Sequence, residues 1–182
     1  SGKSRSAPFN KLKNKESFWL NAVGLHELDQ PDRDDFKINV YNSVPKWATG
    51  SVLYQVFPDR FAKSAEADKR KLPEWAIPKE WGDKVTGKGP GTAEQLYRGD
   101  LKGIEEHLDH LKKIGATILY LTPFFPAGSN HRYDASSFDQ VDPILGGNKA
   151  LSSLVEKAHS MGLKVMGDLT ANHSGDKHEW FT

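Results

Sequence analysis

Three short apolar segments, separated by two segments of helical periodicity, constrain the fold of residues 51–182 more than any other feature. The apolar segments are Val52–Phe57, Ala116–Leu121 and Leu163–Leu169. Between them, apolar side chains recur every three or four residues, as on one face of a helix. They are Leu101, Ile104, Leu108, Leu111 and Ile114 in the first helix, and Leu151, Leu154, Val155, Ala158 and Met161 in the second.

The order along the chain is therefore strand, helix, strand, helix, strand. Gly115 and Gly162 are well placed to end the two helices, and Asn148 is placed to cap the start of the second. Strands this apolar do not leave one face in water, and belong to a parallel sheet covered by helices. We predict an α/β fold in which each crossover is right-handed.

The residues before position 46 have a different character. The first 16 residues carry five lysines and arginines against one glutamate, and we expect a loose tail. Residues 17–45 predict two β-strands: an apolar run from Phe18 to Val23, and an alternating segment, Phe36–Val40, after a polar turn. Two strands alone are marginally stable in water, so this segment must pack on something else. Pro45–Gly50 is predicted to be a linker.

Composition excludes several classes of protein. Hydrophobic residues make up 37% of the 182 residues, or about 46% together with the 16 glycines, and charged residues make up 27%. These shares are typical of globular chains and exclude disorder or a collagen-like fold. The formal net charge of +1 offers no electrostatic reason to expect nucleic acid or an anionic membrane as a partner. No apolar run is long enough to span a bilayer. There is no cysteine, which excludes disulfide frameworks and thiolate chemistry and leaves the compartment open. No apolar leader is visible, which favours a cytoplasmic location, with an extracellular one as the alternative.

Polar and aromatic residues concentrate in the segments that follow the predicted strands. These segments are residues 58–98, residues 122–147 and the residues from Asn172 onward. Parallel α/β folds place their sites at the carboxyl ends of the strands, and loops of this length in a compact domain are usually functional. We therefore expect the functional site there.

Two clusters in these loops have both a binding and a structural interpretation. Asp168, Asn172 and His173 gather a carboxylate, an amide and an imidazole at the tip of the third strand, where they can bind a polar ligand. Alternatively, Asp168 caps backbone amides and His173 is a satisfied loop residue. Tyr133 can stack on a sugar ring beside Asp134; alternatively, it covers the end of the sheet while Asp134 bonds loop amides.

Metal and nucleotide sites have weaker support. His173 and His178 fit neither the HExxH spacing nor a zinc-finger spacing, and nothing in the spacing around Asn172 supports a calcium site. No glycine-rich phosphate loop follows Phe57, which argues against a complete nucleotide-binding domain.

Five segments, taken in order, resemble the opening of the catalytic barrel in the α-amylase family of glycoside hydrolases. They are Val52–Phe61 (VLYQVFPDRF), Tyr97–Ile104 (YRGDLKGI), Gly115–Pro123 (GATILYLTP), His131–Gly147 (HRYDASSFDQVDPILGG) and Gly167–Gly175 (GDLTANHSG). The branch they resemble most contains maltodextrin glucosidase, neopullulanase and cyclomaltodextrinase. The resemblance implies that residues 46–182 form the first three β/α units of a TIM (β/α)8 barrel, and that residues 17–45 are the end of a preceding β-sandwich.

The resemblance also implies roles for individual residues. Asp168, Asn172 and His173 match the family's first conserved segment, in which the histidine binds the sugar at the subsite of cleavage, the aspartate supports the site, and the asparagine ligates calcium in some members. Tyr133 matches the aromatic residue that stacks on that sugar, with Asp134 beside it. Tyr54 matches a first-strand aromatic near the site floor. An α-glucan is the expected partner, and no cofactor is expected beyond this calcium.

The catalytic residues of this retaining family lie on later strands than those predicted here. A retaining glycosidase needs a carboxylate nucleophile facing an acid/base carboxyl group. Residues 51–182 amount to about half of the ~250 residues of a closed barrel. We therefore expect a piece of an α-glucan hydrolase without turnover of its own, which associates with the remainder of the enzyme or with itself through the edge of the third strand.

Two alternatives remain open at this stage. One is a glycosyltransferase or isomerase on the same barrel, such as a trehalose synthase-like or sucrose-acting enzyme. The other is a non-catalytic, amylase-like domain that binds sugar.

Overall fold

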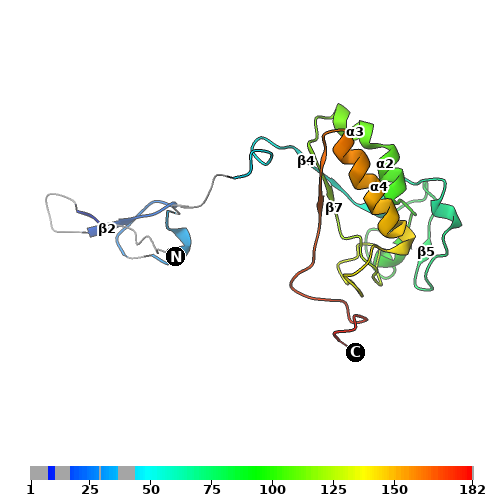
Figure 1. Cartoon of the computed structure of the whole chain (residues 1–182). Helices are drawn as coiled ribbons and strands as arrows, with labels where there is room; N and C mark the ends of the chain where they lie inside the picture. The colour runs from blue at the N-terminus through cyan, green and yellow to red at the C-terminus, as the bar shows by residue number, and fades with distance from the viewer. Residues whose placement is uncertain (1–7, 11–16, 29, 37–43, 182) are drawn as a thin grey trace. The chain divides into compact units, whose positions relative to one another are not determined.

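The computed structural model describes residues 8–10, 17–28, 30–36 and 44–181. The chain divides into two compact units, residues 1–49 and residues 50–182 (Figure 1).

The first unit contains an antiparallel sheet in the order β1-β2-β3. Its strands are β1 (Pro8–Asn10), β2 (Ser17–Leu20) and β3 (Leu25–His26), and a 3-10 turn, η1, spans Asp32–Asp34. Since β1 falls within the first 16 residues, the prediction of a loose tail there is wrong at this strand. The described residues of this unit contain one sheet, which does not establish a β-sandwich.

The predicted strand Phe18–Val23 ends early, at Leu20. The side chain of Asn21 accepts hydrogen bonds from the backbone amides of Val23 (3.0 Å) and Gly24 (3.2 Å), and this closes a turn in place of a strand. Gly24 has a φ of 151°, a conformation that favours glycine. The second predicted strand, residues 36–40, lies outside the described residues except for Phe36, which is not in a strand.

The second unit is built on a parallel sheet in the order β4-β7-β8, which confirms the predicted α/β arrangement (Figure 1). The strands are β4 (Leu53–Val56), β7 (Ile118–Leu121) and β8 (Lys164–Gly167). Within this sheet, the three strands lie side by side in the order in which they occur along the chain.

The longer helices of this unit are α2 (Leu101–Glu106), α3 (Leu108–Lys113) and α4 (Gly147–Ser160). The prediction of one continuous helix over residues 101–114 is wrong at His107. The ring Nδ1 of His107 bonds the carbonyl oxygen of Gly103 (2.8 Å), which its own backbone N–H would use in a continuous helix. That N–H donates instead to Ile104.

The start of α4 also differs from the prediction that Asn148 caps it. The N-cap is Gly146, with a φ of 109°. The Asn148 side chain instead accepts a hydrogen bond from the backbone amide of Val141 (2.8 Å), so it secures the preceding loop.

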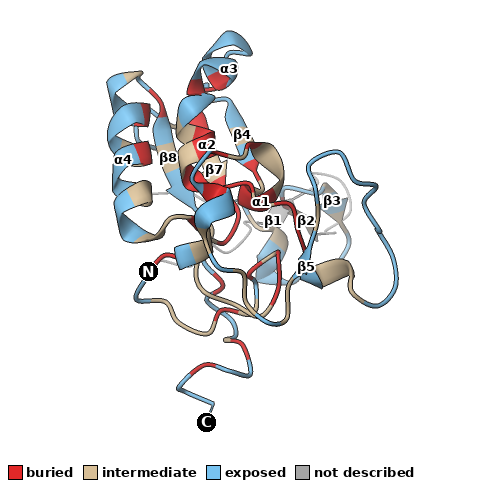
Figure 2. Ribbon diagram, turned by 90° about the vertical axis from the view of Figure 1, so that its right-hand side faces the viewer, coloured by how far each residue is buried: buried red, intermediate tan, exposed pale blue. Residues whose placement is uncertain are grey.

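The core lies between the sheet and the helices, and Figure 2 shows buried residues where α2 and α4 face the strands. Its buried members are Val56, Leu101, Ile104, Leu108, Leu111, Ala116, Leu119, Leu121, Val141, Leu145, Leu154, Ala158 and Leu163. Burial of each large aliphatic side chain stabilises the fold by about 1.5–3 kcal/mol. On the opposite face of the sheet Leu53 and Met166 are 47% and 37% exposed, and no helix of the described residues covers them.

Short elements fill the long segment after β4. They are α1 (Pro58–Phe61), η2 (Ala67–Lys69), β5 (Ile77–Pro78), η3 (Thr92–Glu94) and β6 (Gln95–Leu96), with β5 paired to β6; a further turn, η4 (Pro143–Leu145), precedes α4. The buried Asp59 carboxylate closes this segment by accepting the backbone amides of Tyr97 (3.0 Å) and Arg98 (2.9 Å). No helix within the described part of the chain is long and apolar enough to cross a membrane.

Candidate functional site

Asp168 and two tyrosines form the base of the candidate site. The Asp168 carboxylate accepts a hydrogen bond from the hydroxyl of Tyr133 (2.8 Å) and another from the hydroxyl of Tyr120. Tyr120 is paired with Met166 in the β7–β8 ladder, and Asp168 follows Met166 by two residues. Because side chains alternate along a strand, Tyr120 and Asp168 point to the same face, the one opposite the helices.

These hydrogen bonds change the acidity of both phenols. The bond to Asp168, with burial as a smaller cause, raises the pKa of Tyr120 to about 12. The same two causes raise the pKa of Tyr133 above its usual value. Loss of either proton would place a second negative charge beside the carboxylate, so both hydroxyls stay protonated and act as donors at neutral pH.

His173 lies directly against the loop that carries Tyr133. Its Nε2 is 3.0 Å from the backbone oxygen of Tyr133, and its Nδ1 is 2.8 Å from the side-chain amide nitrogen, Nδ2, of Asn172. A carbonyl oxygen only accepts, so Nε2 carries the hydrogen and Nδ1 accepts from Asn172. His173 and Tyr133 therefore meet at the carboxyl end of the sheet, and both are exposed there, Tyr133 to 38%.

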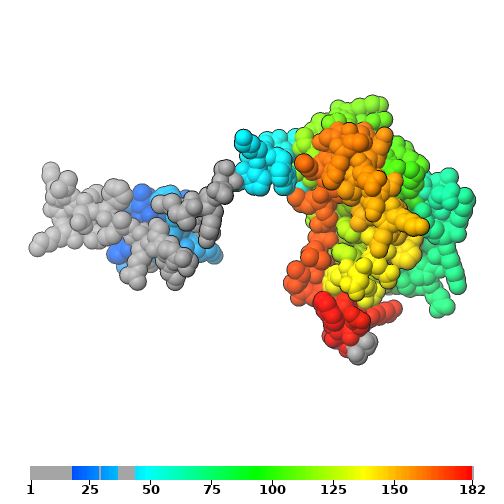
Figure 3. All heavy atoms as spheres, viewed as in Figure 1, coloured from blue at the N-terminus to red at the C-terminus, as the bar shows by residue number. Residues whose placement is uncertain are grey.

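A hollow of about 490 Å³ opens beside His173. Asn172 and His173 line it, together with aromatic side chains from the loop after β7 and from the C-terminal segment. In Figure 3 the atoms of the C-terminal segment (red) lie against those of the loop before α4 (yellow). The backbone amide of Gly175 donates to the oxygen of Ala135 (2.8 Å), which ties the two segments together.

Asp134 supports the loop rather than the hollow. Its carboxylate accepts the backbone amide of Gly128 (3.0 Å) and the hydroxyl of Ser129. This is the structural alternative that the sequence left open for Asp134.

Tyr54 does not join the other candidate residues. The strand register places it beside Leu119, on the face that packs against the helices. Its ring lies edge-on to those of Phe61 (6.4 Å between centroids) and His110 (6.2 Å). The expectation that Tyr54 lies near the floor of the site is therefore wrong.

Residues 55–182 match the family model described as "Alpha amylase, catalytic domain". The chain belongs to the α-amylase family. It is 40% identical over 168 residues to a cyclomaltodextrinase of a Bacillus species, a match that covers 88% of this chain and 28% of the relative. It is 34% identical to an amylopullulanase of Thermoanaerobacter thermohydrosulfuricus, over 87% of this chain and 12% of the relative.

Solved structures of similar proteins agree with this assignment. One is a cyclic alpha-maltosyl-(1→6)-maltose hydrolase from Arthrobacter globiformis, with a TM-score of 0.65 and 36% identity over 76% of this chain and 29% of that one. Another is the type III pullulan hydrolase from Thermococcus kodakarensis, with a TM-score of 0.68 and 29% identity over 91% of this chain and 31% of that one. This α-amylase-family chain thus spans less than a third of the length of each of these four relatives.

Two contributors to the site are residues that sequence reasoning missed. Tyr120 lies within an apolar strand, and its hydroxyl group is the sole polar side-chain group of the segment Ile118–Leu121 that could have indicated a role in the site. Arg132 is 1% exposed, with a positive φ of 61°, and its guanidinium bonds Asp142 (2.9 Å) and the backbone oxygen of Asn130 (2.8 Å). It anchors the loop immediately before Tyr133.

The described residues show no cluster of acidic, histidine or cysteine side chains around Asn172 or elsewhere. They contain no group of three histidine, cysteine, aspartate or glutamate side chains that could hold an ion. The amide nitrogen of Asn172 is used by His173. A calcium ion at Asn172 would require ligands from elsewhere.

Proposed function

We propose that this chain forms the sugar-binding part of the active site of an enzyme that hydrolyses α-glucosidic bonds in maltodextrin- or starch-type glucans. The observation that carries the proposal is the meeting of His173 and Tyr133 at the carboxyl end of the sheet, above Asp168. The names of the relatives, cyclomaltodextrinase and amylopullulanase, support α-glucans as the substrate class.

The chemistry of these side chains suits a pyranose ring. The exposed ring of Tyr133 offers an apolar surface to the C–H groups of a sugar, and its hydroxyl is held by Asp168. The imidazole of His173 and the amide of Asn172 can exchange hydrogen bonds with sugar hydroxyl groups. Because both nitrogens of His173 already have protein partners, a sugar hydroxyl has to replace one of these bonds.

We also propose that this chain alone has no turnover. Retaining glycosidases use two carboxyl groups about 5–5.5 Å apart, one as nucleophile and one as acid/base. Here the Asp134 carboxylate accepts a hydrogen bond within its own loop, and the Asp168 carboxylate accepts hydrogen bonds from two tyrosines. The Asp59 carboxylate is buried. Burial raises the pKa of the Asp59 carboxyl group despite its hydrogen bonds to Tyr97, Arg60 and Arg98. The catalytic pair would come from residues beyond those described.

Within the residues that the structure describes, the two edge strands of the parallel sheet are free to pair with further strands. In the described part of the chain, no strand pairs with the outer side of β4 or β8. Unpaired strand edges bind other strands readily. We propose that further barrel strands or a second copy of the chain pair there, that residues 46–182 are the first three units of a (β/α)8 barrel, and that residues 17–45 belong to a β-sandwich domain.

Binding of maltose to this chain, followed by isothermal titration or NMR, tests the proposal. His173→Ala should weaken binding at least tenfold. His159→Ala, at an exposed position on α4, is the matched control and should leave the affinity unchanged. Equal affinities for the wild type and His173→Ala would overturn the proposal, as would tighter binding of a dinucleotide than of maltose.

A further inference from the structure

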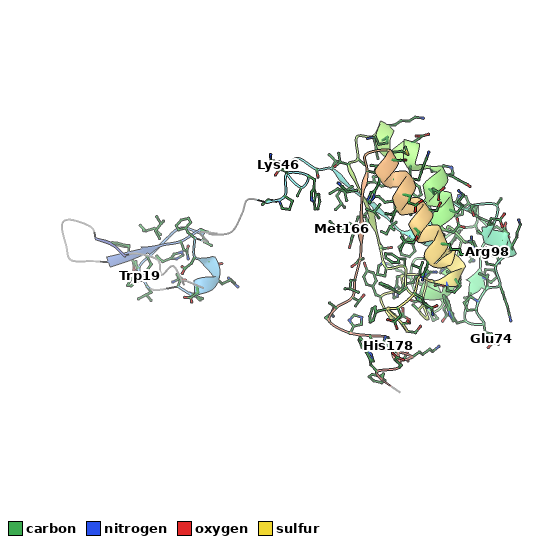
Figure 4. The ribbon with its side chains drawn as sticks, viewed as in Figure 1. Trp19, Lys46, Glu74, Arg98, Met166 and His178 are labelled. Atoms are coloured by element: carbon green, nitrogen blue, oxygen red, sulfur yellow. The ribbon has the colours of Figure 1, made fainter. Side chains whose placement is uncertain are left out.

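Three aromatic rings from two loops pack together at tilted angles beside the candidate site. The rings of Phe138 and His178 have centroids 5.3 Å apart, those of His178 and Trp180 are 4.3 Å apart, and those of Phe138 and Trp180 are 5.8 Å apart. Phe138 comes from the loop before α4, and the other two come from the C-terminal segment, where Figure 4 labels His178. We call these three residues the aromatic platform.

One residue of the platform is buried and another is exposed to solvent. His178 is 2% exposed, whereas Trp180 is 75% exposed. The Nδ1 of His178 accepts the backbone amide of Trp180 (3.2 Å), so its Nε2 carries the hydrogen; Nε2 is buried and has no partner among the described residues. His178 thus holds Trp180 in place, and the indole of Trp180 is exposed.

The platform and His173 share one hollow. The hollow of about 490 Å³ is lined by Phe138, Trp180 and the segment Leu169–Ser174, which includes His173. This lining combines aromatic and aliphatic surface with hydroxyl, amide and imidazole groups. Among the residues that the structure describes, it includes no lysine, arginine, aspartate or glutamate.

The chemistry of this lining specifies its ligand. An anionic ligand, such as a phosphorylated sugar, would find no cation in the lining, and a cationic ligand would find no carboxylate. An uncharged ring with apolar faces and hydroxyl edges suits both the aromatic wall and the polar groups. We infer that the aromatic platform binds a second, uncharged sugar unit, next to the unit bound by Tyr133 and His173. This inference rests on the proposed function, because it takes the first unit to lie at those two residues.

The inference predicts a difference between sugars of one and two units. Maltose should bind this chain more tightly than glucose, because only maltose reaches the platform. Trp180→Ala should weaken maltose binding about three- to tenfold and leave glucose binding unchanged. Trp180 is so exposed that this change should not disturb folding. Trp180→Phe, which keeps an aromatic ring, should retain most of the affinity for maltose.

NMR titration of the tryptophan indole signals provides the test. The Trp180 signal, identified by its absence from the spectrum of Trp180→Ala, should shift with maltose and not with glucose. Trp81→Ala is the matched control, since Trp81 is another exposed tryptophan (45%) and does not line this hollow. Equal affinities of the wild type and Trp180→Ala for maltose would overturn the inference. So would a Trp180 indole signal that does not shift when maltose is added.

The same titrations separate this inference from the proposed function. If Tyr133→Ala leaves both sugar affinities unchanged while Trp180→Ala weakens maltose binding, the proposed role of Tyr133 fails and the platform stands as a sugar site. If Tyr133→Ala weakens the binding of both sugars and Trp180→Ala affects neither, the platform fails and the proposed function stands. If the wild type binds neither sugar, both fail.

Discussion

The hydroxyl of Tyr133 donates a hydrogen bond of 2.8 Å to the carboxylate of Asp168, which joins a loop to the end of a strand 35 residues later in the chain. Tyr120 donates to the same carboxylate from the neighbouring strand. Asp168 therefore sets the position of the exposed tyrosine ring without itself lying in the hollow beside His173.

This arrangement predicts how the two tyrosines titrate. Replacement of Asp168 by Asn weakens the hydrogen bonds, and removes the negative charge, that raise the pKa values of Tyr120 and Tyr133, so both pKa values should fall toward the usual value near 10. Ultraviolet absorbance of phenolate during an alkaline titration measures the change. Asp139→Asn is the control, because Asp139 is an exposed aspartate in the loop that carries Tyr133. Its replacement should not alter the titration curve of the tyrosines. Superimposable titration curves for Asp168→Asn and the wild type would contradict the arrangement.

The same shifts predict the stability of the fold at high pH. The pKa of Tyr120 is raised in the folded state, so its hydrogen bond stabilises the fold fully below pH 10. This contribution to the free energy of unfolding is lost as the pH rises toward about 12. The free energy of unfolding of the wild type should therefore fall more steeply over this range than that of Asp168→Asn. Urea denaturation at a series of pH values checks this, and parallel pH profiles would count against it.

The two functions of Tyr133 can be separated by substitution. Tyr133→Phe keeps the ring and loses the hydrogen bond to Asp168, and should weaken maltose binding by a few-fold, the equivalent of about 1 kcal/mol. Tyr133→Ala loses both the ring and the bond, and should weaken binding by tenfold or more. Isothermal titration measures both variants. If Phe and Ala weaken binding equally, the ring itself contributes nothing.

The parallel sheet and the site at its carboxyl end could be predicted because of how α/β chains are built. Apolar segments alternating with helical periodicity imply parallel strands, and the carboxyl ends of such strands share one edge. Asp168 and His173 follow one strand and Tyr133 follows the preceding one, so their proximity follows from the order of the elements.

The faces of the strands could not be predicted in the same way. In a strand with apolar residues on both sides, the two-residue period does not reveal which side meets the helices. Tyr54 and Tyr120 each lie in such a strand, yet Tyr54 packs among helix side chains and Tyr120 reaches Asp168. Similarly, apolar spacing continues through His107 and cannot show that its ring takes the carbonyl of Gly103 and interrupts the helix.

The glycine of the segment YRGDLKGI at position 99 should tolerate no side chain. A Cβ atom there would lie 2.2 Å from the backbone oxygen of Pro58 and close to the backbone of Asp59. Gly99→Ala should therefore destabilise the fold by about 1–3 kcal/mol or more, because backbone must move to admit the methyl group. Gly87→Ala, which would meet nothing within 4 Å, is the control. Equal denaturation midpoints for these two variants would show that the close approach at Gly99 is absent in solution.

The ion pair between Arg132 and Asp142 should matter far more than pairs on the surface. Both side chains are almost fully buried, at 1% and 5% exposure, and the Nε of Arg132 lies 2.9 Å from the carboxylate. Arg132→Met leaves the Asp142 carboxylate buried without its partner, which should cost about 3–5 kcal/mol. Lys69→Met breaks the exposed pair with Glu66 and should cost less than about 1 kcal/mol. Since Arg132 anchors the loop before Tyr133, Arg132→Met should also weaken maltose binding under conditions where the variant is still folded. A destabilisation no greater than that of Lys69→Met would show that this pair does not hold the loop.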